Sequence, residues 1–122
     1  MKALMFKIAD VMFLVNLEDL LHVSLFEEYD ESEGLTVVDL SDYLDGNSNK
    51  KYILFVTNNK TYVGIICDEI YDILEYNEYK PFEKGEKKLD FLKGVVTYKD
   101  NLIYLLDAEK LIEVAYEKDN VS

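Results

Sequence analysis

The sequence predicts a mainly β protein with short helices, built from two pseudo-symmetric small β-barrel subdomains. Short apolar runs separated by tight turns dominate the chain, as is typical of β hairpins. The same order of segments, which is hairpin, acidic segment, strand, aspartate and helix, occurs twice. A length of 122 residues with 49% hydrophobic residues fits one globular domain.

The first half is expected to form a hairpin, a short helix, an acidic loop, a strand and a second short helix. Their ranges, in order, are 3–8 with 11–15, 17–23, 27–34, 35–38 and 39–46. Leu17, Leu20 and Leu21 share one helical face, which predicts the helix over 17–23. Asp39 suits an N-cap and Gly46 a helix end, so they bound the second helix.

The second half follows a polar connector at 47–51. It is expected to contain a hairpin at 52–67 turning at Asn58-Asn59-Lys60, a helix at 68–74, a charged loop with Pro81 and Gly85, and a hairpin at 91–106 turning at Lys99-Asp100. The helix at 68–74 is predicted because Ile70, Ile73 and Leu74 recur at helical spacing directly after a buried run.

A last helix at 108–118 is expected, with Asp107 as its cap and an inward stripe of Leu111, Ile112 and Ala115. The segment "TVVDLSDYL" matches "YLLDAEKLI" and places Asp39 opposite Asp107. The repeat therefore predicts a single domain over 1–122, with similar halves at 1–46 and 52–107.

The charge of the chain excludes several classes of partner. The formal net charge is -12, and all 13 basic residues are lysines. An acidic surface without arginine repels phosphate backbones and anionic lipids, so neither nucleic acid nor a membrane surface is expected as a partner. No apolar run is long enough for membrane insertion. A single cysteine, Cys67, fits a reducing compartment, which predicts a cytoplasmic protein.

The sequence predicts no catalytic site, metal or cofactor. His22 is the only histidine, so a multi-histidine metal site cannot form within one chain. Cys67 ends a buried run without a basic neighbour, and the acidic run at 27–33 lacks the spacing of a calcium loop. Helix capping accounts for Asp39 and Asp107. The chain is therefore not expected to be an enzyme.

The segment "LFVTNNKTYVGIICDEIYDIL" followed by "LKGVVTYKDNLIYLLDAEKLI" resembles the second half of a CheW-like domain. The matching positions are Gly64, Asp68, Ile70, Gly94, Val95, Leu105, Leu106 and Asp107. The first half matches through "MFKI", "LVNLEDLLHV" and "TVVDLSDYL", but it lacks the Gly-Val-x-Asn-x-Arg-Gly strand and turn of that family.

The resemblance implies two five-stranded, SH3-like barrels around a shared core, with the first barrel incomplete. It also implies a non-catalytic adaptor that couples a chemoreceptor tip to a CheA-type histidine kinase. By position, the kinase-type partner-binding surface would involve the strand pair around Tyr62, Gly64 and Ile66, and the last hairpin, with Tyr98, Asn101 and Tyr104, is a further candidate.

Two alternative functions and the fate of one strand edge remain open. The chain could be a stand-alone regulator that binds the kinase or itself but has lost receptor binding, or a protein that holds a small ligand inside a barrel. A missing strand leaves an open edge. This edge would be filled by a replacement strand at 24–30 or paired by a partner chain, including self-association through the open strand edge.

Overall fold

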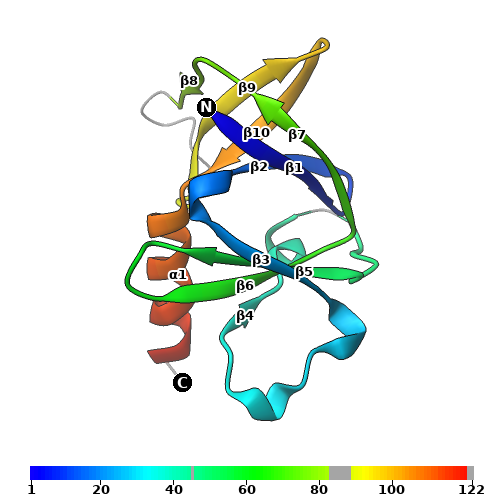
Figure 1. Cartoon of the computed structure of the whole chain (residues 1–122), viewed down its shortest axis with the longest axis vertical. Helices are drawn as coiled ribbons and strands as arrows, with labels where there is room; N and C mark the ends of the chain where they lie inside the picture. Colours follow the sequence, from blue (N-terminus) through cyan, green and yellow to red (C-terminus); the bar gives the residue numbers. More distant parts are fainter. Residues whose placement is uncertain (45, 83–88, 121–122) are drawn as a thin grey trace.

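The computed structural model describes residues 1–44, 46–82 and 89–120, which form two β sheets and one α helix. The predicted mainly β fold with short helices is confirmed. The six-stranded sheet has the order β7-β1-β2-β10-β9-β8, with bounds Glu69–Glu75, Lys2–Ile8, Val11–Asn16, Asn101–Leu106, Leu92–Tyr98 and Lys80–Pro81. The four-stranded sheet has the order β3-β5-β6-β4, with bounds Leu20–Leu25, Tyr52–Thr57, Tyr62–Cys67 and Val37–Val38. Helix α1 spans Ala108–Asn120 (Figure 1).

The two halves of the chain exchange a strand. The β1–β2 hairpin is followed by β3, which pairs with β5 of the second half. The β5–β6 hairpin is followed by β7, which pairs with β1 of the first half. Each half then adds a strand in parallel to the hairpin of the other half, β4 to β6 and β10 to β2. The repeat in the sequence therefore corresponds to a reciprocal arrangement of strands.

The helices predicted at 17–23 and 68–74 are wrong. Only Leu17–Asp19 forms a 3₁₀ turn, and β3 and β7 occupy the rest. Both strands contain a bulge. In β7, Ile73 pairs with Leu4 but Ile70 pairs with Phe6, so β7 has one extra residue between them. A bulge shifts the alternation of side chains by one position, so Ile70 and Ile73, three residues apart, lie on the same face of β7. Leu74 lies on the opposite face and packs in a different apolar cluster from Ile70.

The same irregularity occurs in β3. Leu20 pairs with Val56, whereas His22 pairs with the adjacent Phe55, so Leu21 is the extra residue. Since bulges increase local twist, they suit strands that leave one sheet and join another.

The predicted hairpins, caps and C-terminal helix are confirmed. The helix predicted over 39–46 is only the 3₁₀ turn Leu40–Tyr43, and the strand predicted over 35–38 is only Val37–Val38. The charged loop contains β8 at Lys80–Pro81, and its Gly85 lies outside the described residues. The hairpin turns lie where expected, with Ala9, Asn59, Lys99 and Asp100 at positive φ. The carboxylate of Asp39 accepts a hydrogen bond from the N–H of Ser41 at 3.0 Å, at the start of the 3₁₀ turn Leu40–Tyr43. Asp107 accepts from the N–H of Lys110 at 3.1 Å at the start of α1.

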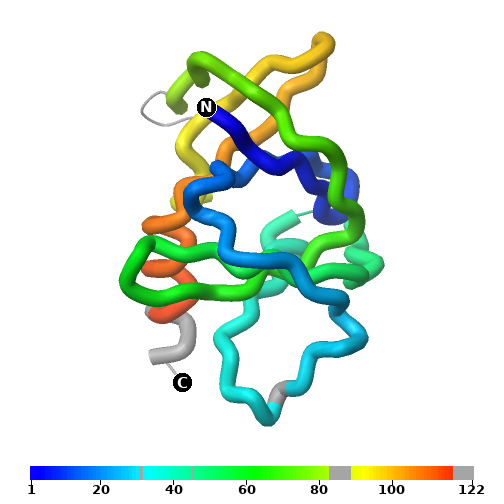
Figure 2. Tube along the Cα trace, in the orientation of Figure 1, coloured from blue at the N-terminus to red at the C-terminus, as the bar shows by residue number. Residues whose placement is uncertain are grey.

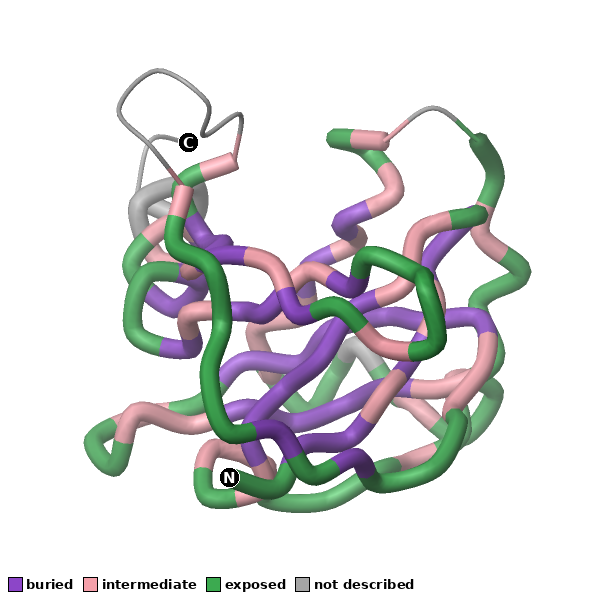
Figure 3. The backbone as a smooth tube through the Cα atoms, turned by 90° about the horizontal axis from the view of Figure 1, so that it is seen from above, coloured by how far each residue is buried: buried purple, intermediate pink, exposed green. Residues whose placement is uncertain are grey.

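Three apolar clusters stabilise this arrangement. The central core lies between the sheets and includes Phe6 and Leu54, with Leu111 of α1 packed against it. The inward stripe predicted for α1 is buried there. Figure 3 shows the buried residues gathered in the central strands, and exposed residues in the turns.

The apolar clusters on the outer faces of the two sheets differ in size. The outer face of the six-stranded sheet has seven buried residues: Ala3, Leu14, Leu74, Tyr76, Val96, Ile103 and Leu105. The outer face of the four-stranded sheet has only Ile53, Phe55 and Ile66. Among the described residues, the four-stranded sheet therefore has the smaller cluster on its outer face.

The difference arises in the connections between strands. Residues 76–100 connect β7 to β10 and include β8 and β9, whereas residues 26–36 connect β3 to β4 without a strand. Figure 2 shows 26–36 as a wide loop at the opposite end of the molecule from the β9–β10 hairpin. The expected replacement strand at 24–30 is wrong, because Ser24 and Leu25 end β3 on β5 and Phe26–Glu28 is a 3₁₀ turn.

Candidate functional site

One of the two candidate partner-binding surfaces lies on the β9–β10 hairpin. Tyr98 and Asn101 pair across its turn. The Asn101 Nδ2 donates to the Lys99 carbonyl at 3.3 Å, and the Lys99 Nζ lies 5.3 Å from the centre of the Tyr98 ring. Lys99 and Asp100 both have positive φ, as a two-residue hairpin turn of this hand requires. These contacts fix the tip of the hairpin.

The hairpin borders a concavity with a volume of about 680 Å³, which is lined by Tyr98, Asn101 and Tyr104. We call it the hairpin surface; its other lining residues are Met5, Asp10, Val11, Met12, Tyr71, Lys99, Leu102 and Ile103. Leu102 is 61% exposed, the highest fraction among the large apolar side chains described. Aromatic residues and methionines around an exposed apolar side chain are the composition typical of a protein-binding surface.

Tyr104 joins the hairpin surface to a second, mostly apolar cavity of about 300 Å³. The ring of Tyr104 stacks on that of Phe82, with 6.3 Å between the ring centres. The centre of the Phe13 ring lies 6.2 Å from that of Tyr104. Tyr43 and Leu92 also line this cavity. Tyr104 is therefore held by neighbouring rings on two sides, which presents it in one orientation to a partner.

One edge of the hairpin surface is polar. Tyr71 of β7 donates a hydrogen bond from its hydroxyl to Glu69, and the Lys7 Nζ lies 3.6 Å from the same Glu69 oxygen. The hydrogen bond from Tyr71, and then the charge of Lys7, lower the pKa of Glu69. The same hydrogen bond raises the pKa of Tyr71. Glu69 is thus a fixed negative charge beside the apolar surface.

The second predicted group, Tyr62, Gly64 and Ile66, lies on one face of β6 in the other sheet. Tyr62 is 41% exposed, and its ring meets that of Phe55 edge-on at 6.2 Å. Gly64 and Ile66 are buried, and Val37 and the 26–36 loop pack over this face. A Cβ on Gly64 would lie 2.8 Å from the Ile53 Cγ2, so glycine is required by packing. Of the three, only Tyr62 has an exposed side chain.

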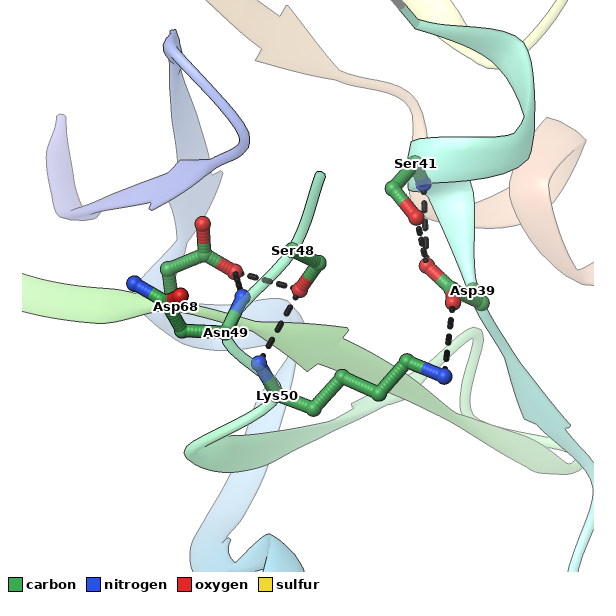
Figure 4. Close-up of polar contacts among 6 residues, drawn as sticks. All are labelled: Asp39, Ser41, Ser48, Asn49, Lys50 and Asp68. Atoms are coloured by element: carbon green, nitrogen blue, oxygen red, sulfur yellow. Dashed lines mark hydrogen bonds and ion pairs between the residues drawn. The ribbon is translucent and has the colours of Figure 1, made fainter. Parts of the chain in front are cut away.

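A corner centred on Asp68 sets where β6 ends and β7 begins. The buried carboxylate accepts hydrogen bonds from the N–H groups of Ala9 and Asn49, each at 3.0 Å, and from the Ser48 hydroxyl. Figure 4 shows this carboxylate at the connector, next to Lys50, whose Nζ lies 3.6 Å from Asp39. The corner ties the first hairpin turn to the connector between the halves, and its role is structural.

Cys67 and His22 are two further side chains of types that take part in catalysis. Burial, and then the charge of Asp68, raise the pKa of Cys67 to about 12, which keeps the thiol protonated. His22 is exposed on β3 and stacks on Phe55 at 4.4 Å between ring centres. Within residues 1–44, 46–82 and 89–120, no three metal-ligating side chains gather, and no helix is long and apolar enough to cross a membrane.

Sequence reasoning identified the tip of the hairpin but missed its neighbours. Met5, Met12, Tyr71 and Leu102 also line the hairpin surface. Tyr71 was assigned to a helix, which hid its place on a strand beside β1. Leu102 is followed by Ile103, and two adjacent apolar residues of a strand point to opposite faces, so one of the two was expected to face away from the core.

Comparisons with known proteins place this arrangement among related folds. The sequence model of the CheW-like domain matches residues 31–115, which is more than half of the chain. The fold is similar to that in the crystal structure of the scaffolding protein TtCheW from Thermoanaerobacter tengcongensis, with a TM-score of 0.66 and 19% sequence identity. That similarity covers 86% of this chain and 87% of the other. No curated protein matches the sequence.

Proposed function

The chain belongs to the CheW-like domain family, and on that premise we propose that it is a non-catalytic cytoplasmic adaptor. It binds a CheA-type histidine kinase and couples it to a chemoreceptor tip through protein–protein contacts. Members of this family are scaffolds without catalytic activity, which supports the non-catalytic part of the proposal.

The observation that supports this proposal most is the hairpin surface. It combines an exposed leucine, two methionines and the rings of Tyr71, Tyr98 and Tyr104 on rigid strands. A few buried aromatic and apolar anchors supply most of the affinity of a typical interface. We assign the kinase contact to this surface, with Tyr98, Asn101 and Tyr104 at its centre and Leu102 as an added anchor.

The test is a binding titration of the full chain against the regulatory domain of a CheA-type kinase from the same source. Leu102→Glu places a charge on the surface without disturbing the core, since Leu102 is 61% exposed. The expected weakening is at least tenfold, because an interface anchor contributes about 2 kcal/mol or more. Leu25→Glu, at a 40% exposed site on β3, is the matched control and is expected to bind normally. Equal affinity of the two variants would refute the assignment.

A second function is favoured by the connection between β3 and β4. Residues 26–36 hold no strand, and this is the part of the chain where the family has the Asn-x-Arg-Gly segment. The alternative is therefore a stand-alone CheW-like regulator that binds the kinase, or itself, without a receptor. Capture of kinase but not of receptor fragments in the same pull-down would favour it, and capture of both would favour the adaptor.

A further inference from the structure

Strand β4 has one free edge. It pairs with β6 in parallel, and the N–H of Gly64 donates to the Thr36 carbonyl at 2.9 Å. In a parallel ladder, alternate residues direct their N–H and C=O to the neighbouring strand. The N–H and C=O of Val37 therefore point away from β6. Among the strands of the described ranges, none lies along that edge.

The second half of the chain shows what fills the equivalent edge. β10 corresponds to β4, since each pairs in parallel with the second strand of a hairpin and each is followed by a capping aspartate. The other edge of β10 is covered by β9, which is antiparallel to it. By this internal comparison, the free edge of β4 is a vacant position for one antiparallel strand.

A groove opens on the outer face of the same sheet, and Leu35, two residues before β4, is one of its lining residues. It has a volume of about 450 Å³ and is lined on its sheet side by Ile53, Phe55 and Tyr62. Glu28, Tyr29 and Glu33 of the 26–36 loop form part of its rim. Alternate side chains of an added strand would point into the groove, so a partner strand gains both backbone hydrogen bonds and apolar contacts.

The charge around the groove selects the occupant. No lysine or arginine occurs between Lys7 and Lys50, and the loop at 26–36 is rich in glutamate and aspartate. Hydrogen bonds from Ser32 lower the pKa of Asp30, which keeps that exposed carboxylate ionised. A second copy of the chain, with a net charge of -12, would be repelled, whereas a basic segment would be attracted.

We propose that the free edge of β4 and the groove accept an extended, basic segment of another protein, which adds to the sheet as an antiparallel strand. The inference does not rest on the proposed kinase contact, because the 26–36 loop lies at the opposite end of the molecule from the β9–β10 hairpin (Figure 2).

The test uses the full chain and three fluorescent seven-residue peptides in an anisotropy titration. The first alternates lysine with valine, the second alternates glutamate with valine, and the third repeats the first with alternate backbone N–H groups methylated. We expect only the first to bind well, with an affinity that falls as salt is raised. Loss of a backbone hydrogen bond in the third should weaken binding about three- to tenfold. In NMR spectra, the amide of Val37 should shift with the first peptide.

Val37→Pro removes the outward N–H without removing a bond to β6, and it should weaken the first peptide by a similar factor. Val37→Ala keeps the N–H and is the matched control. Circular dichroism checks that both variants fold, and the methylated peptide tests the same bond without any change in the protein. Kinase binding is expected to persist in Val37→Pro, which separates this inference from the proposed function.

Four results would overturn the proposal. Equal binding of the acidic and basic peptides would remove the role of charge, and equal binding of the methylated peptide would remove strand addition. Absence of binding by all three peptides would also overturn it, as would a dimer in light scattering whose Val37 amide is protected from exchange.

Discussion

The carboxylate of Asp68 accepts a hydrogen bond from the backbone N–H of Ala9 at 3.0 Å, although the two residues belong to different halves of the chain. Ala9 occupies the turn of the first hairpin with φ 55, and Asp68 follows the last residue of the second. The second carboxylate oxygen binds Asn49 and Ser48. One side chain thus holds together a turn, a connector and a strand crossing.

Replacing Asp68 with Ala should lower the free energy of unfolding by about 2–4 kcal/mol, because buried donors would lose a charged acceptor. Urea denaturation followed by circular dichroism measures this change. Asp72→Asn, at an exposed position on β7, is the control and should change stability by less than about 0.5 kcal/mol. Similar stability of the Asp68 variant and the unmodified chain would show that the corner is dispensable.

Two glycines are expected to differ in their tolerance of a methyl group. A Cβ on Gly94 would lie 2.3 Å from the backbone carbonyl oxygen of Lys80, whereas the nearest atom to one on Gly64 is a side-chain methyl at 2.8 Å. Gly94→Ala should therefore displace β8 from β9 and destabilise by about 1–3 kcal/mol, with Gly64→Ala less affected. Thermal unfolding and amide exchange near Lys80 compare the two; the reverse order would contradict the packing.

Tyr116 anchors α1 to the β5–β6 hairpin. Its hydroxyl donates to the Tyr62 carbonyl at 3.1 Å and lies 2.8 Å from the Thr61 hydroxyl. Tyr116→Phe keeps the ring and should lose about 1 kcal/mol of stability, as expected for hydrogen bonds that are partly exposed. Tyr79→Phe, at a 40% exposed site away from α1, is the control for removal of a hydroxyl. Equal unfolding midpoints in urea would show that the apolar stripe alone holds the helix.

The buried thiol of Cys67 predicts how the stability of the fold depends on pH. Burial raises the pKa of Cys67 from 9.0 to about 12, so an unfolded chain releases the thiol proton at lower pH than the folded chain does. The stability supplied by this group is complete below pH 9 and declines as pH rises toward 12. A smaller decline in Cys67→Ala, measured by urea denaturation at pH 8, 10 and 11, would confirm the sign.

The same burial should make Cys67 unreactive. At pH 8 a disulfide reagent such as Ellman's reagent is expected to modify the folded chain slowly, and the chain in urea rapidly. Rapid modification without denaturant would show that the thiol is accessible and that its pKa is not raised.

Local patterns predicted hairpins and caps well because those elements depend on neighbouring residues. The turns at Asn59 and Lys99 need positive φ, and the caps at Asp39 and Asp107 need a short acceptor before a helical turn; both requirements are visible in the sequence. The C-terminal helix followed from its apolar stripe for the same reason.

The two crossing strands were predicted as helices because their structure depends on distant partners. Ile70, Ile73 and Leu74 have helical spacing, but in β7 a bulge places Ile70 and Ile73 on one face, and Leu74 lies on the other. No local signal identifies β1 as the partner, since strand pairing depends on tertiary context.

For the candidate surfaces too, the sequence predicted what depends on neighbouring residues and missed what depends on distant ones. Tyr98, Asn101 and Tyr104 share the hairpin surface, as their placement on one hairpin suggested. The apolar run at 62–67 indicated burial of Gly64 and Ile66, but the sequence did not show that the 26–36 loop covers them, because the path of that loop depends on distant contacts.

The reciprocal exchange of β3 and β7 has a consequence for how the chain reaches its native state. Neither hairpin finds the strand beside it within its own half, so most stabilising contacts join residues far apart along the chain. Such high contact order implies slow folding that is completed only when both halves have left the ribosome. A cut within 47–51 would give two fragments that are each unable to fold alone and that regain structure only when mixed.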